Sequence, residues 1–239
     1  MKLSARMEPF DSFWEAPEDI QKGYKSFGKF YKRNYLKFLP NNRADKILVV
    51  SCGPGYFVNL LKSEGYTDVF GIDSDTEKIK FALEKDLNCA VAESFRFLNG
   101  HHEDFDVIIA EQEINHLTTE EIIKFLELCH HSLKENGVLI VHSINGANPI
   151  TGIESFTQNI DHFNSFTEYS LRQVLEFADF QEVNIFPLNL YIFYENPLNY
   201  IGLLIDKSLT LFFKLCFMFY GKSNSLFTKK IGAFCRKSS

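Results

Sequence analysis

"KILVVSCGPGYFVNLL", residues 46–61, decides the fold, because an apolar run, a glycine-rich turn and a second apolar run follow one another directly. The first run predicts a buried strand and the second predicts a helix. Glycines after a strand let the backbone come close to a ligand, and the helix that follows offers free N–H groups. The turn therefore predicts a site for a small ligand with a nucleotide part.

Short apolar runs and amphipathic segments alternate along the chain beyond this stretch. The expected strands are 47–51, 68–72, 89–92, 105–110, 137–142, 182–188 and 229–236. The expected helices are 56–64, 75–85, 119–133, 167–180 and the very apolar segment 198–220. Gly137 stands where a C-cap for the helix 119–133 is wanted, and Thr167 is placed to cap the helix that follows it. This order predicts an α/β fold with a doubly wound, mixed seven-stranded sheet and helices on both faces.

Aromatic residues recur at helical spacing before the first strand. They are Tyr24, Phe27, Tyr31, Tyr35 and Phe38, within an aromatic-rich stretch at 8–40. This spacing predicts an N-terminal helical cap over 1–44. The remainder, 45–239, is expected to be one domain that carries an apolar helical insertion at 189–226, before the last strand.

Charge and cysteine content limit the function classes. The 239 residues carry a net charge of −6, which argues against a protein that mainly wraps nucleic acid. The segment from Leu198 to Ser239 contains seven basic residues and a single acidic one, Asp206, so this tail differs in charge from the rest of the chain. The five cysteines lie far apart without zinc spacing, so we expect reduced thiols and no metal site. No secretory signal pattern opens the chain, and a cytoplasmic protein is therefore expected.

The type of nucleotide ligand can be narrowed from two positions. A dinucleotide site would have a third glycine where Val58 stands, which disfavours NAD. Asp73 ends the next expected strand, where a carboxylate can accept both hydroxyls of a ribose. A role for Asp73 as a helix cap is the structural alternative.

The order of "ILVVSCGPG", "GIDSD", "AVAES", "FDVIIAEQEINHL" and "LKENGVLIVHS" resembles the class I S-adenosylmethionine-dependent methyltransferases, over about residues 45–142. The resemblance implies a Rossmann-like fold with S-adenosylmethionine as the cofactor. It implies these cofactor-binding residues: Ser51, Cys52, Gly53 and Gly55 in the turn, Asp73 and Ser74 at the ribose, Glu93 and Ser94 at the adenine, and Glu111 and Gln112 beside the transferable methyl. Gly53 and Gly55 would lie against the methionine end. Val49 stands where the family usually has an acidic residue, and Ser51 replaces the first glycine, so cofactor capture is expected to be weaker.

The segment "NGANPITGIESFTQNIDHFNSFTEYSLRQVLEFADF" is similar to a methyltransferase subgroup encoded with bacterial polysaccharide and O-antigen biosynthesis. This resemblance implies O-methylation of a sugar hydroxyl, in a polysaccharide or a lipid-linked saccharide. Two alternatives stay open. One is methylation of another small or lipophilic acceptor such as a quinone precursor, and the other is a non-catalytic, cofactor-binding or membrane-associated protein.

A hydroxyl acceptor needs a base that titrates near neutral pH, for which histidine is suited. His162 lies in the loop of the second resemblance, and His116 lies just past the strand 105–110, so these two are the candidate catalytic residues. His101 and His102 lie in a polar loop and His130 and His131 close a helix, so these four are expected at the surface. His142 ends the strand 137–142 and has two interpretations, a further candidate or a core residue.

The apolar segment 198–220 needs a covering surface. Its residues 206, 207, 210 and 214 fall within one narrow stripe of a helix, so the rest of that helix is apolar. We expect peripheral contact of 198–239 with an anionic membrane at its cytoplasmic face. Packing on the sheet edge, or on a second subunit in a homodimer, stays open.

Overall fold

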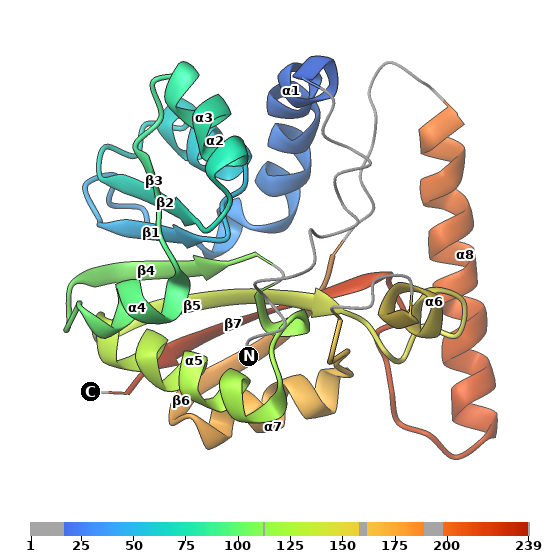
Figure 1. The fold of residues 1–239 in the computed structure, drawn as a ribbon. Coiled ribbons are helices and arrows are strands. Elements are labelled where there is room, and N and C mark those ends of the chain that lie inside the picture. The colour runs from blue at the N-terminus through green and yellow to red at the C-terminus, as the bar shows by residue number, and fades with distance from the viewer. Residues whose placement is uncertain (1–16, 112, 158–161, 189–197, 239) are drawn as a thin grey trace.

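The computed structural model describes residues 17–111, 113–157, 162–188 and 198–238. Its centre is a seven-stranded sheet in the order β3-β2-β1-β4-β5-β7-β6 (Figure 1). The strands are β1 Ile47–Val50, β2 Val69–Asp73, β3 Cys89–Val91, β4 Phe105–Ala110, β5 Leu133–Ile144, β6 Phe180–Leu188 and β7 Lys230–Lys237. β7 runs antiparallel to both of its neighbours, while the pairs from β3 to β5 are parallel.

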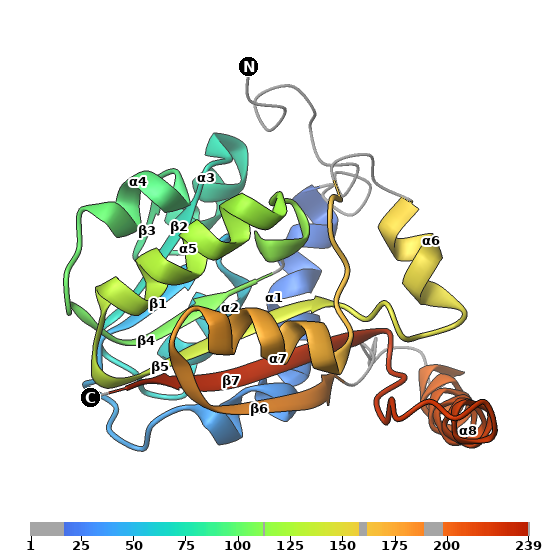
Figure 2. The same ribbon diagram turned by 90° about the horizontal axis from the view of Figure 1, so that it is seen from below.

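Helices cover both faces of this sheet (Figure 2). One face carries α1 Pro17–Asn34, α2 Tyr56–Ser63 and α3 Thr76–Glu84, and the other carries α4 Ser94–Asn99, α5 Thr119–Ser132 and α7 Glu168–Phe177. α6 Thr151–Thr157 and α8 Leu198–Phe219 project beyond the carboxyl ends of the strands. Two short 3-10 helices are η3 Leu36–Phe38 and η4 Glu113–Asn115.

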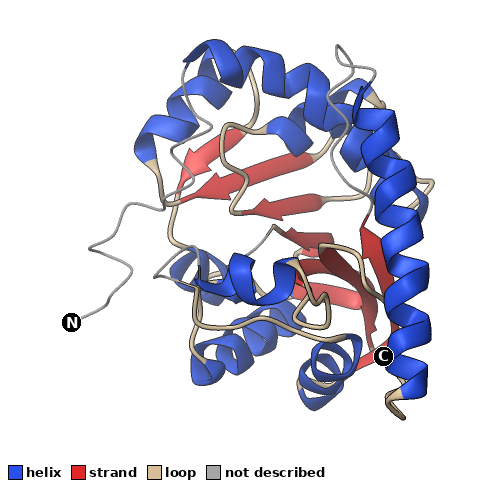
Figure 3. Ribbon diagram, turned by 90° about the vertical axis from the view of Figure 1, so that its right-hand side faces the viewer, coloured by secondary structure: helices blue, strands red, loops and turns tan. Residues whose placement is uncertain are grey.

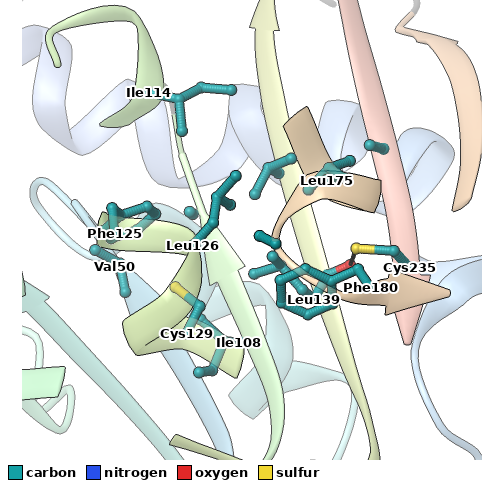
Figure 4. Packing of buried hydrophobic residues seen from close by; sticks show 14 of the residues in the cluster. Val50, Ile108, Ile114, Phe125, Leu126, Cys129, Leu139, Leu175, Phe180 and Cys235 are labelled. Carbon is teal, nitrogen blue, oxygen red and sulfur yellow. Dashed lines mark hydrogen bonds between the residues drawn. The ribbon is translucent and has the colours of Figure 1, made fainter. Parts of the chain in front are cut away.

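Alternate residues of β1 belong to different cores. Leu48 and Val50 pack with the residues beneath α5 and α7, whereas Ile47 and Val49 pack beneath α1 and α2. Figure 4 shows the first core, with Val50 beside Phe125 of α5. A strand that is buried on both faces reads as a continuous apolar run, and "ILVV" does so.

The order in which the chain adds strands to the sheet reverses beside β1. The chain passes from β1 to β2 and β3 on one side and then returns to β4 on the other. Ligands of open α/β sheets bind at the carboxyl ends of the strands, where the strand order reverses. A ligand site is therefore expected at the carboxyl ends of β1, β2 and β4.

The predicted mixed seven-stranded sheet is confirmed, and most predicted boundaries agree closely with the structure. Thr167 caps α7 as expected, since its Oγ1 accepts from the N–H of Ser170 at 3.3 Å. The C-cap assigned to Gly137 is wrong. α5 ends at Ser132 and β5 begins at Leu133, so Gly137 lies within the strand. It is small because a Cβ there would lie 2.8 Å from the carbonyl oxygen of Lys134.

The short helices α4 and α6 were not predicted, because six or seven residues hold less than two helical turns of pattern. Residues 1–16 of the predicted cap 1–44 lie outside the described residues, and α1 is the helix within its described part. The division at residue 44 stays a prediction. Within the described parts of the chain, none of the helices combines the length and the apolar character needed to cross a membrane.

Candidate active site

The turn after β1 is bonded to the end of β2. The N–H of Gly53 donates to Oδ2 of Asp73 at 2.8 Å. Gly53 has φ +54, and a Cβ built on it would meet nothing within 4 Å, so this part of the backbone faces open space. The turn therefore offers the side-chain-free surface on which a ligand can lie.

Gly55 has a packing role in the turn. It has φ +82, and a Cβ there would lie 2.8 Å from Leu87 and 3.2 Å from Ala82. Gly55 thus allows the turn to pack on the α3 layer, and the expected contact with the methionine end stays a prediction. The room for Val58 comes from Gly71 of β2, since a Cβ on Gly71 would lie 2.9 Å from Val58.

Asp73 is oriented by two backbone N–H groups. In addition to Gly53, the N–H of Asp75 donates to its Oδ1 at 2.9 Å. The helix cap is Asp75, whose Oδ1 accepts from Glu77 and Lys78, so the alternative that Asp73 caps α3 is wrong. A carboxylate oxygen has more than one acceptor position. Both oxygens of Asp73 can therefore still accept hydrogen bonds from hydroxyl groups at the carboxyl edge of the sheet.

The residues expected around the ribose and adenine differ in what they contact. Glu93 caps α4, because its carboxylate accepts from the N–H groups of Phe95 at 3.2 Å and Arg96 at 2.9 Å. Ser94 is buried and Ser74 is exposed. These observations give Glu93 a structural role that the sequence did not predict, and its contact with adenine stays a prediction.

Ser51 and Cys52 form the first part of the turn. Ser51 has φ +55, a left-handed conformation that favours glycine. The thiol of Cys52 packs against Gly71 and Cys89, and its hydrogen bond to Cys89 together with burial raises its pKa well above the usual value. Cys52 is therefore a neutral, buried thiol.

Glu111 follows β4 directly and lies against the turn. Its N–H donates to the carbonyl oxygen of Val50 at 3.2 Å, and its Oε2 accepts from the Tyr31 hydroxyl at 2.6 Å. Oε1 is inaccessible to solvent and has no hydrogen-bond partner among the described residues. Burial raises the pKa of Glu111 to about 8, against the lowering effects of Tyr31 and Lys230. An acceptor without a partner at this depth indicates a ligand site.

The N-terminal helix encloses the same place. The Tyr24 hydroxyl donates to the carbonyl oxygen of Pro54 at 2.6 Å, and Phe27 stacks on Tyr56 with centroids 4.8 Å apart. The aromatic spacing predicted a helix but not the surface it covers. α1 thus contributes Tyr31 and Tyr24 to the walls of the candidate site.

The two candidate bases are in contact. The rings of His116 and His162 lie 4.7 Å apart between centroids and are inclined by 59°. Both side chains are partly exposed. Gln112, the remaining predicted site residue, lies outside the described residues.

Asn115 holds the two histidine segments together, and no pattern in the sequence predicts this role. Its Nδ2 donates to Ser143 Oγ at 3.1 Å and to the carbonyl oxygen of Asn164 at 2.7 Å. Its Oδ1 accepts from the N–H of Ile144, and its backbone carbonyl accepts from the N–H of Phe163 at 2.8 Å. This fully buried side chain fixes residues 162–164 beside η4.

The other histidines lie elsewhere. His142 is a core residue, as one of the two interpretations expected: it is buried, and its Nδ1 lies 2.5 Å from the Tyr35 hydroxyl. His130 and His131 lie in the last turn of α5 and border a surface hollow with Asp179, near the start of β5 and away from the carboxyl ends of β1, β2 and β4. His101 stacks on Phe97. No group of metal-ligating side chains was found among the residues that the structure describes.

The residues present fit the cofactor that the resemblance implies. S-adenosylmethionine carries an ammonium group, a sulfonium and two ribose hydroxyls, all of which attract acceptor oxygens. Asp73 presents two oriented carboxylate oxygens, Glu111 has a buried oxygen without a partner, and Gly53 leaves the backbone open.

Comparison with known proteins gives a family match. A family model described as "Methyltransferase domain" matches residues 24–185. Among curated proteins, the chain is 30% identical over 131 residues to the mitochondrial ubiquinone biosynthesis O-methyltransferase of Rattus norvegicus, over 48% of this chain and 37% of that protein. The chain spans about half or less of the length of the curated relatives it matches.

Two solved structures share the fold. A SAM-dependent methyltransferase from Archaeoglobus fulgidus is 18% identical, with a TM-score of 0.67 over 95% of this chain and 98% of that chain. Phosphoethanolamine N-methyltransferase 2 of Haemonchus contortus, in complex with S-adenosyl-L-methionine, is 14% identical, with a TM-score of 0.60 over 98% and 61%. At these identities the likeness concerns the fold.

Proposed function

This chain belongs to the methyltransferase-domain family, and from that premise we propose that it transfers a methyl group from S-adenosylmethionine to a hydroxyl group of its acceptor. S-adenosylmethionine is its methyl donor. The observation that carries the hydroxyl acceptor is the contact between His116 and His162 just beyond β4. Two imidazoles beyond the carboxyl end of β4 supply the base that a hydroxyl requires.

When bound, S-adenosylmethionine supplies a methyl group that is already activated on a sulfonium. The residues of the chain therefore have to hold the two reactants in line and exclude water. Asp73 holds the ribose with its two oriented oxygens, and the open backbone at Gly53 lies against the rest of the ligand.

Glu111 supplies the negative charge that the family usually has at the position of Val49. Val49 pairs with Ile109 in the sheet, and Glu111 follows Ile109 by two residues, so it lies on the same face nearer the carboxyl edge. A cation of the ligand gives its orphaned Oε1 a partner. The substitution at position 49 is in this way compatible with cofactor binding.

His162 acts as the base and His116 orients its ring. The proton of the acceptor hydroxyl passes to His162 as the oxygen takes the methyl group. The methyl–sulfur bond breaks with its electron pair on the sulfur, so that S-adenosylhomocysteine would be the leaving group. Asn115 keeps both segments in register through its contacts with Asn164 and Phe163.

Two acceptor classes follow. The name of the rat relative favours a lipophilic acceptor such as a quinone precursor. A sugar hydroxyl, in a polysaccharide or lipid-linked saccharide, rests on the loop resemblance alone. The asparagines of that loop have structural partners, since Asn145 donates to the carbonyl oxygens of Leu226 and Thr228, and Asn148 donates to that of Phe227.

The test measures S-adenosylhomocysteine formation with quinone precursors, nucleotide sugars and glycolipids in parallel. We expect turnover with one class, and turnover lowered about a hundredfold or more in His162→Ala on that class. Calorimetry with S-adenosylhomocysteine separates the non-catalytic alternative. Tight binding without turnover on any hydroxyl acceptor would contradict the proposed reaction, and absence of binding would contradict the cofactor site itself.

A further inference from the structure

α8 exposes large apolar side chains along one side. It has 22 residues, which corresponds to a length of about 33 Å. Its outward face is defined here by six residues that are each between 45% and 67% exposed: Ile201, Leu204, Leu211, Phe212, Leu215 and Met218. At about 100° per residue these six fall within an arc of about 120°.

The opposite side of α8 faces the protein. The ring of Phe217 lies 4.6 Å from that of Phe227, and the ring of Phe213 lies 6.2 Å from it. Asp206 lies on this inner side and is partly buried, and its burial raises its pKa. The helix is therefore anchored by its inner side, and its acidic residue is turned away from the outward face.

The charges next to the outward face are positive. Lys207 and Lys214 are exposed and border the arc on one side. Ser208 falls within the arc, but its hydroxyl donates to the carbonyl oxygen of Leu204 at 2.9 Å and needs no external partner. An apolar face bordered by lysines is the arrangement of helices that lie in the interface of anionic membranes.

The position of α8 is compatible with such contact. Figure 1 shows α8 beyond the ends of β4 and β5, and Figure 3, which looks onto that side, shows it running beside the sheet. α6 projects from the same side (Figure 2). Ile153 of this helix and Ile150, which directly precedes it, have exposed side chains. The surface is thus reachable without any rearrangement of the sheet.

We propose that the outward face of α8 docks on a membrane surface that carries anionic lipids, with Lys207 and Lys214 at the headgroups. A second copy of the chain fits this face less well. A symmetric contact would bring lysines beside an apolar seam, while the acidic residue of α8, Asp206, lies on the inner side. The docking is independent of methyl transfer, because it uses no residue of the candidate active site.

The test is cosedimentation of the full chain with vesicles of phosphatidylcholine alone or with phosphatidylglycerol added. We expect strong pelleting with the anionic vesicles only. Lys207→Gln with Lys214→Gln should weaken it about tenfold or more, and Leu204→Glu with Leu211→Glu should abolish it. Lys80→Gln with Lys124→Gln, two exposed lysines on other helices, is the matched control and should leave it unchanged.

Thermal unfolding of each variant checks that the fold is intact. The proposal is overturned if the chain stays in the supernatant with both vesicle types, if neutral vesicles pellet it equally, or if the control pair weakens binding as much as the α8 pair. A dimer in light scattering that Leu211→Glu dissociates, without pelleting, would assign the face to a second copy and also overturn it.

Discussion

The imidazoles of His116 and His162 lie 4.7 Å apart between ring centroids, although His116 directly follows η4 and His162 lies in the loop that precedes α7. Asn115 connects these two segments by a side-chain bond to Asn164 and a backbone bond to Phe163. The pair is therefore a product of tertiary structure, and it gives the clearest tests of the proposed chemistry.

Replacement of His162 by alanine should lower turnover about a hundredfold or more, because the acceptor hydroxyl loses its base. The affinity for S-adenosylhomocysteine, measured by calorimetry, should change little. His131→Ala, at an exposed histidine that ends α5, is the control. Unchanged turnover of His162→Ala would remove this residue from the mechanism.

The double variant His116→Ala with His162→Ala should be no slower than the slower single variant, within about threefold, because residues that act as a unit are not additive. Initial rates of the four proteins give the comparison. Fully additive losses would show that the two rings act separately.

Asn115→Ala should lower kcat at least tenfold and the free energy of unfolding by about 1–3 kcal/mol, because several buried bonds lose their partner. Ser143→Ala removes one of these bonds and should have a smaller effect on both. The pH profile of kcat distinguishes a positioning role from a structural one. The part of the profile that depends on a histidine base should disappear in Asn115→Ala and persist in Ser143→Ala. A normal profile with normal kcat would leave Asn115 a purely structural role.

Glu111→Gln should weaken S-adenosylmethionine binding about tenfold or more, since a charge-assisted contact contributes about 1.5–3 kcal/mol. The pKa of Glu111 is raised to about 8. At pH 7 the free protein is therefore mostly protonated there, and binding of a cation should release about one proton. Calorimetry in two buffers of different ionisation enthalpy measures this release, which should vanish in Glu111→Gln. Equal proton release by both proteins would place the titration elsewhere.

The same carboxyl group makes stability depend on pH. The folded pKa of Glu111 lies above its usual value of 4.5. Its contribution is fully present below the unfolded pKa and is lost as pH rises towards about 8, because the unfolded state ionises first. Glu111→Gln should thus gain up to a few kcal/mol relative to the natural protein between these pH values, as urea unfolding would show. A constant difference across pH would contradict the raised pKa.

Ser51→Gly should stabilise the protein by about 0.5–1 kcal/mol, because a left-handed conformation costs a serine about 1–2 kcal/mol and glycine less, offset by the freer unfolded chain. Thermal unfolding measures it. Ser208→Gly, inside α8, should destabilise by a similar amount. A loss of stability in Ser51→Gly would show that contacts of the hydroxyl outweigh the strain.

The sequence alone determined the order and type of the strands and the position of the turn. Local signals are sufficient there: "ILVV" is apolar on both faces, Gly53 and Gly55 mark the turn, and Thr167 caps a helix through a residue only three positions away. Such patterns act within one helix, strand or turn, so they can be interpreted without the contacts made by the rest of the chain.

Tertiary structure decided which side chains meet. Four features of the site depend on contacts that only the folded chain shows. They are the choice between Asp73 and Asp75 as cap, the packing role of Gly55, the oxygen of Glu111 without a partner, and the hydrogen bonds of Asn115. Sequence periodicity fixes which face a residue occupies but not the element that covers it. For the same physical reason the apolar character of α8 was readable, whereas the direction of its exposed arc and of Asp206 was not.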